Sequence, residues 1–307
     1  RPRMHGRDRS MKPMSNNEHM PGPLPVTFKD YGDRATDRVG RGIQGAGIEI
    51  ALQGNAITDA RACIADIKGP VQAEGVTPGI GHQLGNALDE PVLILKSAIG
   101  NRSLGWDLLP PGSPSYEFEL EVKNRQTKQL EKKTFIFAGY GQSPDKWEKG
   151  TDPKPIGWKA GVQYDGDVAR AKDVLNNLGE YYPGATEYEV AGFLWWQGDK
   201  DRYNEGHAAM YEKNLNNLIA ALRKDFNAPK AKFVCATLGQ TSKENAKGNE
   251  KLILDAMFAI SDVTKYPALK GDVATVYTNP LSMGGASNGH YGGNAKTYMN
   301  VGLSMGK

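Results

Sequence analysis

Short apolar runs alternate with longer amphipathic stretches from about residue 75 to the end of the chain. The short runs have the length and the β-branched and aromatic content that are typical of strands. We predict strands at residues 92–99, 134–138, 190–196, 232–238 and 273–278. Between them the pattern predicts helices at residues 81–88, 167–178, 205–226, 249–260 and 293–306.

The predicted helix at 205–226 has the clearest periodicity. Its apolar positions follow one helical face, and a polar face lies opposite. The apolar face holds Tyr211, Leu215, Leu218, Ile219, Leu222 and Phe226, and the polar face holds Lys213, Asn216, Arg223 and Lys224. Such a helix is expected to pack one side on a sheet.

Strands that are apolar almost throughout, separated by helices, favour a parallel sheet that is covered on both faces. We therefore predict the α/β class, as a three-layer α/β/α sandwich with a central parallel sheet. In sheets of this kind the ligand crevice lies outside the carboxyl ends of the strands. The residues that follow positions 99, 196 and 278 are the first place to look for chemistry.

The chain is predicted to form one domain over residues 31–307, preceded by an N-terminal segment. Residues 1–30 hold few apolar side chains, and Pro21, Pro23 and Pro25 disfavour a helix or a central strand there. Residues 110–161 interrupt the alternation, with a Lys/Glu-rich stretch at 119–133. We interpret residues 110–161 as an inserted, elaborated loop that contains a hairpin and helps to line the crevice.

Composition and charge exclude several classes of protein. The chain has 307 residues, of which 39% are hydrophobic and 24% charged, which is ordinary for a folded domain and unlike a disordered chain. The net charge is +3, and residues 1–14 alone carry +4, so the rest has no excess of basic residues that would indicate nucleic-acid binding. No apolar run approaches the roughly 20 residues of a membrane span.

The cysteines and the N-terminus bear on metals and location. Cys63 and Cys235 are far apart, with no Cys/His cluster at metal-ligand spacing, so no metal site is predicted. They form either a disulfide or two separate core residues. The Arg-rich start is not followed by an apolar segment, so no signal peptide is visible. The chain either begins after a processing site or is intracellular, and we expect a secreted or periplasmic protein.

Polar motifs follow two of the predicted strands. Gly100 comes directly after the first strand, where a glycine leaves a backbone N–H free to bind an oxyanion or simply turns the chain. The third strand leads into Gln197-Gly198-Asp199-Lys200-Asp201. Asp201 is also placed to cap the following helix.

One of the five histidines has a position suited to catalysis. His290 lies in the glycine-rich stretch 284–293, between the last predicted strand and the last helix, and this loop is expected to open onto the crevice. We interpret the other four, His5, His19, His82 and His207, as structural or solvated.

Three segments resemble blocks of a known family. Trp195-Trp196-Gln197-Gly198-Asp199-Lys200-Asp201 is similar to the W-x-Q-G-E-x-D block of the sialate O-acetylesterase-like carbohydrate esterases. These belong to the SGNH (GDSL-like) hydrolases, a flavodoxin-like fold, and include acetylxylan esterases. Residues 80–85 and 91–100 resemble the helix and strand before the family's second block, with Gly100 as its glycine. Residues 290–298 resemble its histidine block, so the resemblance covers about residues 75–307.

The resemblance implies a serine nucleophile, a histidine base and an oxyanion hole. The family's G-Q-S-N-M block is not intact here, and its nearest match is Met14-Ser15-Asn16, so Ser15 is the candidate nucleophile. Ser143, in Gly141-Gln142-Ser143, follows a predicted strand and is the rival.

The other site roles follow from the same blocks. His290 is the implied base, and Gly100 and Gln197 are the implied oxyanion hole. Ser287 stands where many relatives have an aspartate, so the partner of His290 is a backbone carbonyl, Asp199 or Asp201. A further set of residues is expected to bind substrate: Asn101, Trp196 and Tyr291.

The sequence therefore predicts a serine esterase, a carboxylic ester hydrolase that removes O-acetyl groups from a sialate- or xylan-type carbohydrate. Its expected partner is a small or polymeric carbohydrate ester, and no cofactor, metal, nucleic acid or membrane is expected. The alternative is a non-catalytic carbohydrate-binding or scaffold protein on a degenerate copy of the same fold, because the first block and the aspartate are missing.

Overall fold

The apolar runs form the strands of a five-stranded sheet, in the order β2-β1-β6-β7-β8. The computed structural model describes residues 45–53, 75–88, 91–181, 184–283, 291 and 294–307. The five strands are β1 (Gly45–Gln53), β2 (Val92–Gly100), β6 (Glu189–Trp195), β7 (Lys232–Ala236) and β8 (Val273–Val276). The pairs β6–β7 and β7–β8 are parallel, as predicted.

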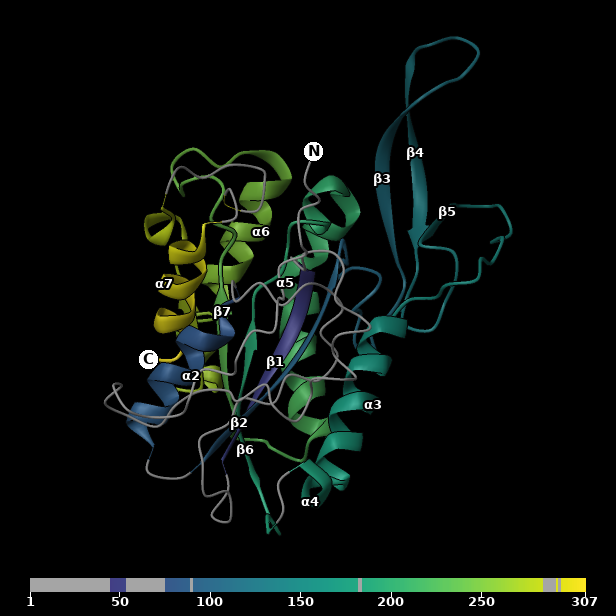
Figure 1. Ribbon diagram of the computed structural model, residues 1–307. Helices are drawn as coiled ribbons and strands as arrows, with labels where there is room; N and C mark the ends of the chain where they lie inside the picture. Colours follow the sequence, from purple (N-terminus) through teal and green to yellow (C-terminus); the bar gives the residue numbers. More distant parts are fainter. Residues whose placement is uncertain (1–44, 54–74, 89–90, 182–183, 284–290, 292–293) are drawn as a thin grey trace, which may run out of the picture.

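Strand β1 is the exception to the parallel arrangement. It lies between β2 and β6 and is antiparallel to both, with Gly45 paired to Gly100 at one end. Because β2 and β6 are each antiparallel to β1, they run in the same direction as each other and as β7 and β8. The carboxyl ends of these four strands therefore lie at one edge of the sheet, towards the top of Figure 1. The sequence did not predict β1.

Helices cover both faces of the sheet, which confirms the α/β sandwich (Figure 1). One layer holds α2 (Thr77–Ala87) and α7 (Ala295–Met305), and they pack with Ile94, Leu194 and Ala236 of the strands. The other layer holds α3 (Val162–Asn176), α4 (Leu178–Tyr181), α5 (Glu205–Asp225) and α6 (Gly248–Ala259). Successive strand residues point to opposite faces, so β2, β6, β7 and β8 each contribute to both cores.

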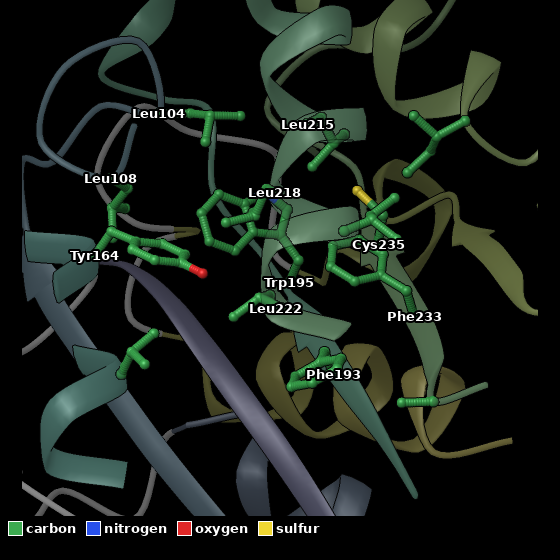
Figure 2. Close-up of a cluster of buried hydrophobic side chains, with 14 of the residues drawn as sticks. Leu104, Leu108, Tyr164, Phe193, Trp195, Leu215, Leu218, Leu222, Phe233 and Cys235 are labelled. Carbon is green, nitrogen blue, oxygen red and sulfur yellow. The ribbon is translucent and has the colours of Figure 1, made fainter. Parts of the chain in front are cut away.

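The larger core lies between the sheet and the second helix layer (Figure 2). Phe193 and Trp195 of β6 and Phe233 of β7 meet Leu215, Leu218 and Leu222 of α5 there, each at most 1% exposed. Cys235 is a fully buried free thiol in this core, and burial raises its pKa. Its proposed disulfide partner, Cys63, lies outside the described residues.

The predicted hairpin is present within residues 110–161. Strands β3 (Tyr116–Lys123), β4 (Leu130–Phe137) and β5 (Lys146–Glu148) form a separate antiparallel sheet. The run at 134–138, which has the composition of a central strand, forms the end of β4 and is not part of the main sheet. The β3–β4 hairpin projects beyond the strand-end edge of the main sheet in Figure 1.

Two helices begin at an asparagine that caps their N-terminus. Asn204 precedes α5, and its side-chain oxygen accepts a hydrogen bond from the backbone N–H of His207. Asn294 caps α7 in the same way, accepting from Lys296 and Thr297. Within the described part of the chain, no helix has the length and apolar character needed to cross a membrane.

Candidate active site

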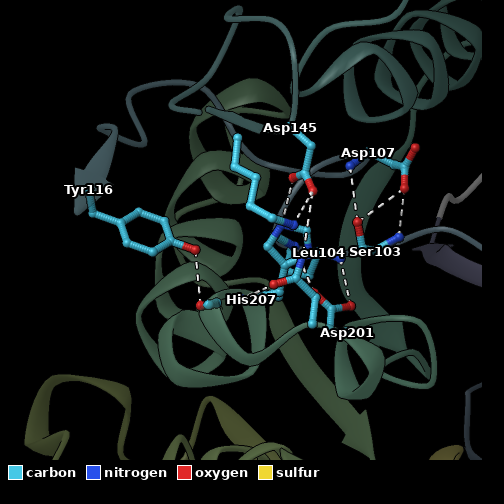
Figure 3. A network of polar contacts seen from close by, with 11 residues as sticks. Ser103, Leu104, Asp107, Tyr116, Asp145, Asp201 and His207 are labelled. Atoms are coloured by element: carbon cyan, nitrogen blue, oxygen red, sulfur yellow. Dashed lines mark hydrogen bonds and ion pairs between the residues drawn. The ribbon is translucent and has the colours of Figure 1, made fainter. Parts of the chain in front are cut away.

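The chain turns sharply after β6, and the side chain of Asp201, which follows this turn, is buried. Gly198 has a φ of 139°, a conformation that favours glycine, and the short 3₁₀ helix η2 (Asp201–Tyr203) follows. The Asp201 carboxylate is fully buried and accepts hydrogen bonds from the backbone N–H groups of Leu104 and Gly105, at 2.9 and 2.8 Å (Figure 3). Asp201 thereby ties the end of β6 to the turn that follows β2.

Burial and hydrogen bonding act in opposite directions on the Asp201 carboxyl, and its hydrogen-bond partners favour the charged form. Burial raises the pKa of this carboxyl, while the nearby His207, the Gln197 side chain and the two backbone N–H groups act in the opposite direction. All three hydrogen-bond partners of the carboxyl are N–H donors, so a protonated Asp201 has no acceptor for its own hydrogen among them. We therefore interpret Asp201 as an ionised structural anchor.

Gln197 joins the same connection from the β6 side. Its Nε2 donates to the Asp201 carboxylate at 2.6 Å and to the backbone oxygen of Arg102 at 3.0 Å. Its Oε1 accepts from the Tyr211 hydroxyl of α5 at 2.9 Å. Arg102 is two residues beyond Gly100, so two of the three segments singled out in the sequence, those with Gly100 and Gln197, lie together.

The turn after β2 begins with a residue in the left-handed backbone conformation. Asn101 has a φ of 61°, in the left-handed region that asparagine tolerates better than most residues, and its side chain is exposed. Gly100 is exposed as well. The Asn101 side chain is therefore accessible to a substrate, and its predicted substrate contact stays a prediction.

The predicted oxyanion role of Gln197 requires a change of partner. Both hydrogens of its amide nitrogen are directed to protein acceptors, the Arg102 oxygen and Asp201. An oxyanion would have to compete with one of these acceptors for the same N–H. The Gly100 N–H and the Gln197 amide stay predictions as oxyanion donors.

The third segment is anchored next to the second. The Tyr291 ring stacks on Trp196 with a centroid distance of 5.4 Å, and the Tyr291 hydroxyl accepts from the backbone N–H of Gly239 at 3.1 Å. Trp196 donates from Nε1 to the backbone oxygen of Thr237 at 3.0 Å. His290 lies outside the described residues, but its neighbour Tyr291 is thus placed beside the residue that precedes Gln197.

These contacts limit how Trp196 and Tyr291 can serve a sugar. Tyr291 is 6% exposed and belongs to the smaller core with Tyr298, while Trp196 is half-buried at its margin. Burial, with a contribution from the charge of Asp199, raises the pKa of Tyr291 to about 12. Packing accounts for most of the surface of both rings, and their predicted sugar contacts stay predictions.

Asp199 and Asp201 occupy different environments although they are two residues apart. The Asp199 side chain is 53% exposed, pairs with Arg202 at 2.9 Å and accepts from Gln240 at 3.4 Å. Its charge also acts on Tyr291, the residue after His290. Both oxygens of Asp201 are occupied. Asp199 therefore has an oxygen open to a further donor and Asp201 does not, and the acid partner of His290 stays a prediction.

One known protein family matches more than half of the chain. The model of one family, described as carbohydrate esterase, sialic acid-specific acetylesterase, matches residues 113–271. The chain belongs to this family. The matched region contains the segment from Gln197 to Asp201, whereas Gly100 and the His290 segment lie on either side of it.

Curated proteins and solved structures give little beyond the family match. A search of curated proteins returned no match. Among solved structures, a protein from Arabidopsis thaliana matches with 19% identity and a TM-score of 0.35, over 47% of this chain and 50% of that chain. The chain therefore spans about half the length of that protein, and this likeness carries no argument here.

Of the two candidate nucleophiles, Ser143 lies within the described residues. Ser15 lies outside the described residues. Ser143 is described, and its hydroxyl is engaged: it donates to the backbone oxygen of Trp158 at 2.7 Å and accepts from the N–H of Ile156 at 2.9 Å. These bonds fasten two parts of the insertion to each other, so we interpret Ser143 as structural.

Ser143→Ala is expected to leave esterase activity within about twofold of wild type and to cost about 1–2 kcal/mol of stability, because it removes loop hydrogen bonds only. The measurement is kcat and KM for p-nitrophenyl acetate together with a thermal melt. A loss of several hundredfold in kcat with an unchanged melt would instead identify Ser143 as the nucleophile.

The insertion is fixed to the start of α5 by a second polar cluster, also in Figure 3. His207 is 4% exposed, and its Nε2 lies 2.8 Å from Oδ1 of Asp145. The Tyr116 hydroxyl donates to the backbone oxygen of Gly206 at 2.9 Å, and the Phe137 ring packs edge-on against His207. The environment of His207 agrees with its predicted structural role.

Several residues of the site were not found from the sequence. Ser103 and Asp107 are both buried, and the Asp107 carboxylate accepts from the N–H and the hydroxyl of Ser103 at 2.8 and 3.1 Å. This bond closes the turn after β2, as an aspartate four residues after a serine in a glycine-flanked turn could have indicated. Tyr211 was predicted as core and also orients Gln197. Among the residues that the structure describes, no cluster of His, Cys, Asp and Glu could hold a metal ion.

Proposed function

We propose that this carbohydrate esterase hydrolyses O-acetyl esters of sugars through a serine nucleophile. The main support is the connection built by Gln197, which bonds to Arg102 and Asp201 and so brings the Gly100 turn to the end of β6. Family membership, which covers the Gln197 segment, supports the same chemistry. Trp196 and Tyr291 bring the start of the His290 segment to this edge.

The proposed reaction has two steps. The Ser15 hydroxyl attacks the ester carbonyl while His290 takes its proton, and His290 then gives that proton to the sugar oxygen as the C–O bond breaks. A water molecule, activated by His290, next attacks the acetyl-serine and releases acetate. The N–H groups of Ser15 and Gly100 and the amide of Gln197 stabilise the oxyanion, each contributing about 10²–10³ in rate.

The same proposal covers substrate and location at a coarser level. Carbohydrate esters are the substrate class that the family implies, and we propose sialate- or xylan-type acetyl esters within it. We further propose a secreted or periplasmic location, where acetylated polysaccharides are met. The non-catalytic alternative is not favoured by membership in an esterase family.

The purified protein is expected to release acetate from acetylated xylan or O-acetylated sialic acid, and to prefer p-nitrophenyl acetate over the butyrate and octanoate esters. The preference is expected because acetyl is the acyl group that the proposed substrates carry. The measurement is acetate release and kcat/KM across the ester series. A folded protein that releases no acetate but binds the polysaccharide would establish the non-catalytic alternative, and a preference for octanoate would indicate a lipid or thioester substrate.

A further inference from the structure

Tyr203 is a large aromatic side chain that the folded core does not use. It closes η2, two residues after the buried Asp201, and it is 71% exposed. Exposing a ring of this size to water is unfavourable compared with burying it. Tyr203 is therefore a candidate for contact with a ligand.

The exposed ring is held in place by a buried cation. Arg202, whose side chain is only 13% exposed, donates from Nη2 to the Tyr203 hydroxyl at 3.0 Å, and its guanidinium carbon lies 5.0 Å from the centre of the ring. Arg202 in turn pairs with Asp199 at 2.9 Å and Glu250 at 3.5 Å. Asn249 donates to the Arg202 backbone oxygen at 3.0 Å. The ring is thus preorganised, which lowers the entropy that a ligand must overcome.

The ring lies at the edge of the sheet where the candidate active site is built. Asp201, at the other end of η2, is bonded directly to Gln197. Asp199 connects Arg202 to Gln240, and its charge reaches Tyr291. A sugar presents hydroxyl groups and an apolar C–H face. Carboxylate and amide groups can bond to the hydroxyls, and an aromatic ring can stack on the C–H face.

We propose that Tyr203 stacks on a sugar ring adjacent to the acetylated one, so that the substrate of this esterase is an oligo- or polysaccharide of neutral sugars. This inference rests on the proposed function for the role of the neighbouring sugar. Neutral sugars follow from charge: Arg202 is paired with Asp199 and Glu250, so the cluster carries one net negative charge and disfavours a carboxylate on the ligand.

Tyr203→Ala is expected to raise KM for acetylated xylo-oligosaccharides about fivefold to tenfold, with kcat little changed. The reason is that stacking of a sugar on an aromatic ring stabilises the bound substrate and the transition state equally. Activity on p-nitrophenyl acetate, which has no second ring, is expected to stay at the wild-type level. Tyr203→Trp keeps the ring face and is expected to keep KM low.

Tyr188→Ala is the matched control. Tyr188 is 41% exposed and directly precedes β6, so it lies at the opposite edge of the sheet. It is expected to leave KM unchanged for every substrate. Equal losses on p-nitrophenyl acetate and on the oligosaccharide in Tyr203→Ala would overturn the stacking role, as would an unchanged KM for the oligosaccharide.

A binding experiment separates this inference from the proposed function. In native gels that contain xylan, the wild type is expected to migrate more slowly than in plain gels, and Tyr203→Ala to lose that retardation while Tyr188→Ala keeps it. Gels with polygalacturonate are expected to cause no retardation. If the wild type releases no acetate but is retarded by xylan, and Tyr203→Ala is not, the esterase proposal fails and the sugar-stacking role of Tyr203 stands. Equal retardation of wild type and Tyr203→Ala would overturn the sugar-stacking role of Tyr203.

Discussion

His290→Ala is expected to lower kcat for acetyl-ester hydrolysis by about 10³-fold or more, because it removes the proposed base that activates the serine and protonates the leaving sugar. Tyr291, the residue after His290, stacks on Trp196, which precedes Gln197. The measurement is kcat for p-nitrophenyl acetate, with a thermal melt to confirm folding. Ser15→Ala is expected to cause a loss of similar size.

His82→Ala provides the control for this experiment. His82 is an exposed residue of α2 whose ring lies 3.2 Å from the Asn86 side chain, four residues on. Its removal is expected to change neither kcat nor the melt. If His290→Ala were as active as His82→Ala, the base would have to be sought elsewhere. If only Ser15→Ala kept full activity, the base would stand and the nucleophile would be another serine.

The parts of the fold that were predictable are those where burial alone decides the structure. Helix α5 begins at Glu205 as predicted, since its apolar face repeats without interruption from Tyr211 to Leu222. Strands β6 and β7 have largely apolar, buried side chains, as expected for strands with helices on both faces. By contrast, β1 lies in a segment whose neighbours show no regular pattern, and its antiparallel direction depends on long-range pairing with β2 and β6. No local pattern encodes that direction.

The site was predictable to the level of segments and not of individual roles. The Gly100 turn and Gln197 were expected to meet because strands that run in the same direction end at the same edge of a sheet. Asp199 and Asp201 look equivalent in the sequence, and only the turn at Gly198 with η2 decides that one is exposed and the other buried. The proposed role of Tyr203 has no sequence signal, because it depends on the exposure of the ring and on its contact with Arg202.

Asp201→Ala is expected to destabilise the protein by about 3–5 kcal/mol and to lower activity strongly, because it leaves buried N–H donors without their acceptor. The donors are the backbone of Leu104 and Gly105 and the amide of Gln197. With Asp201 gone, the turn after β2 keeps only the hydrogen bond from Gln197 to the Arg102 oxygen as its link to the end of β6 in this cluster, so the proposed oxyanion donors are expected to lose their spacing. A urea or thermal melt measures the first effect, and kcat measures the second.

Asp199→Ala is the comparison that makes the Asp201 result specific. The Asp199 side chain is about half exposed and Arg202 keeps its contact with Glu250, so the loss of this ion pair is expected to cost about 1 kcal/mol. If Asp199 orients His290, this variant also loses activity, but with a nearly unchanged melt. The two acids are thus expected to separate: Asp201→Ala lowers stability and activity together, and Asp199→Ala lowers activity alone. A melt of Asp201→Ala that matches the wild type would show that the buried carboxylate does not hold the two strand ends together.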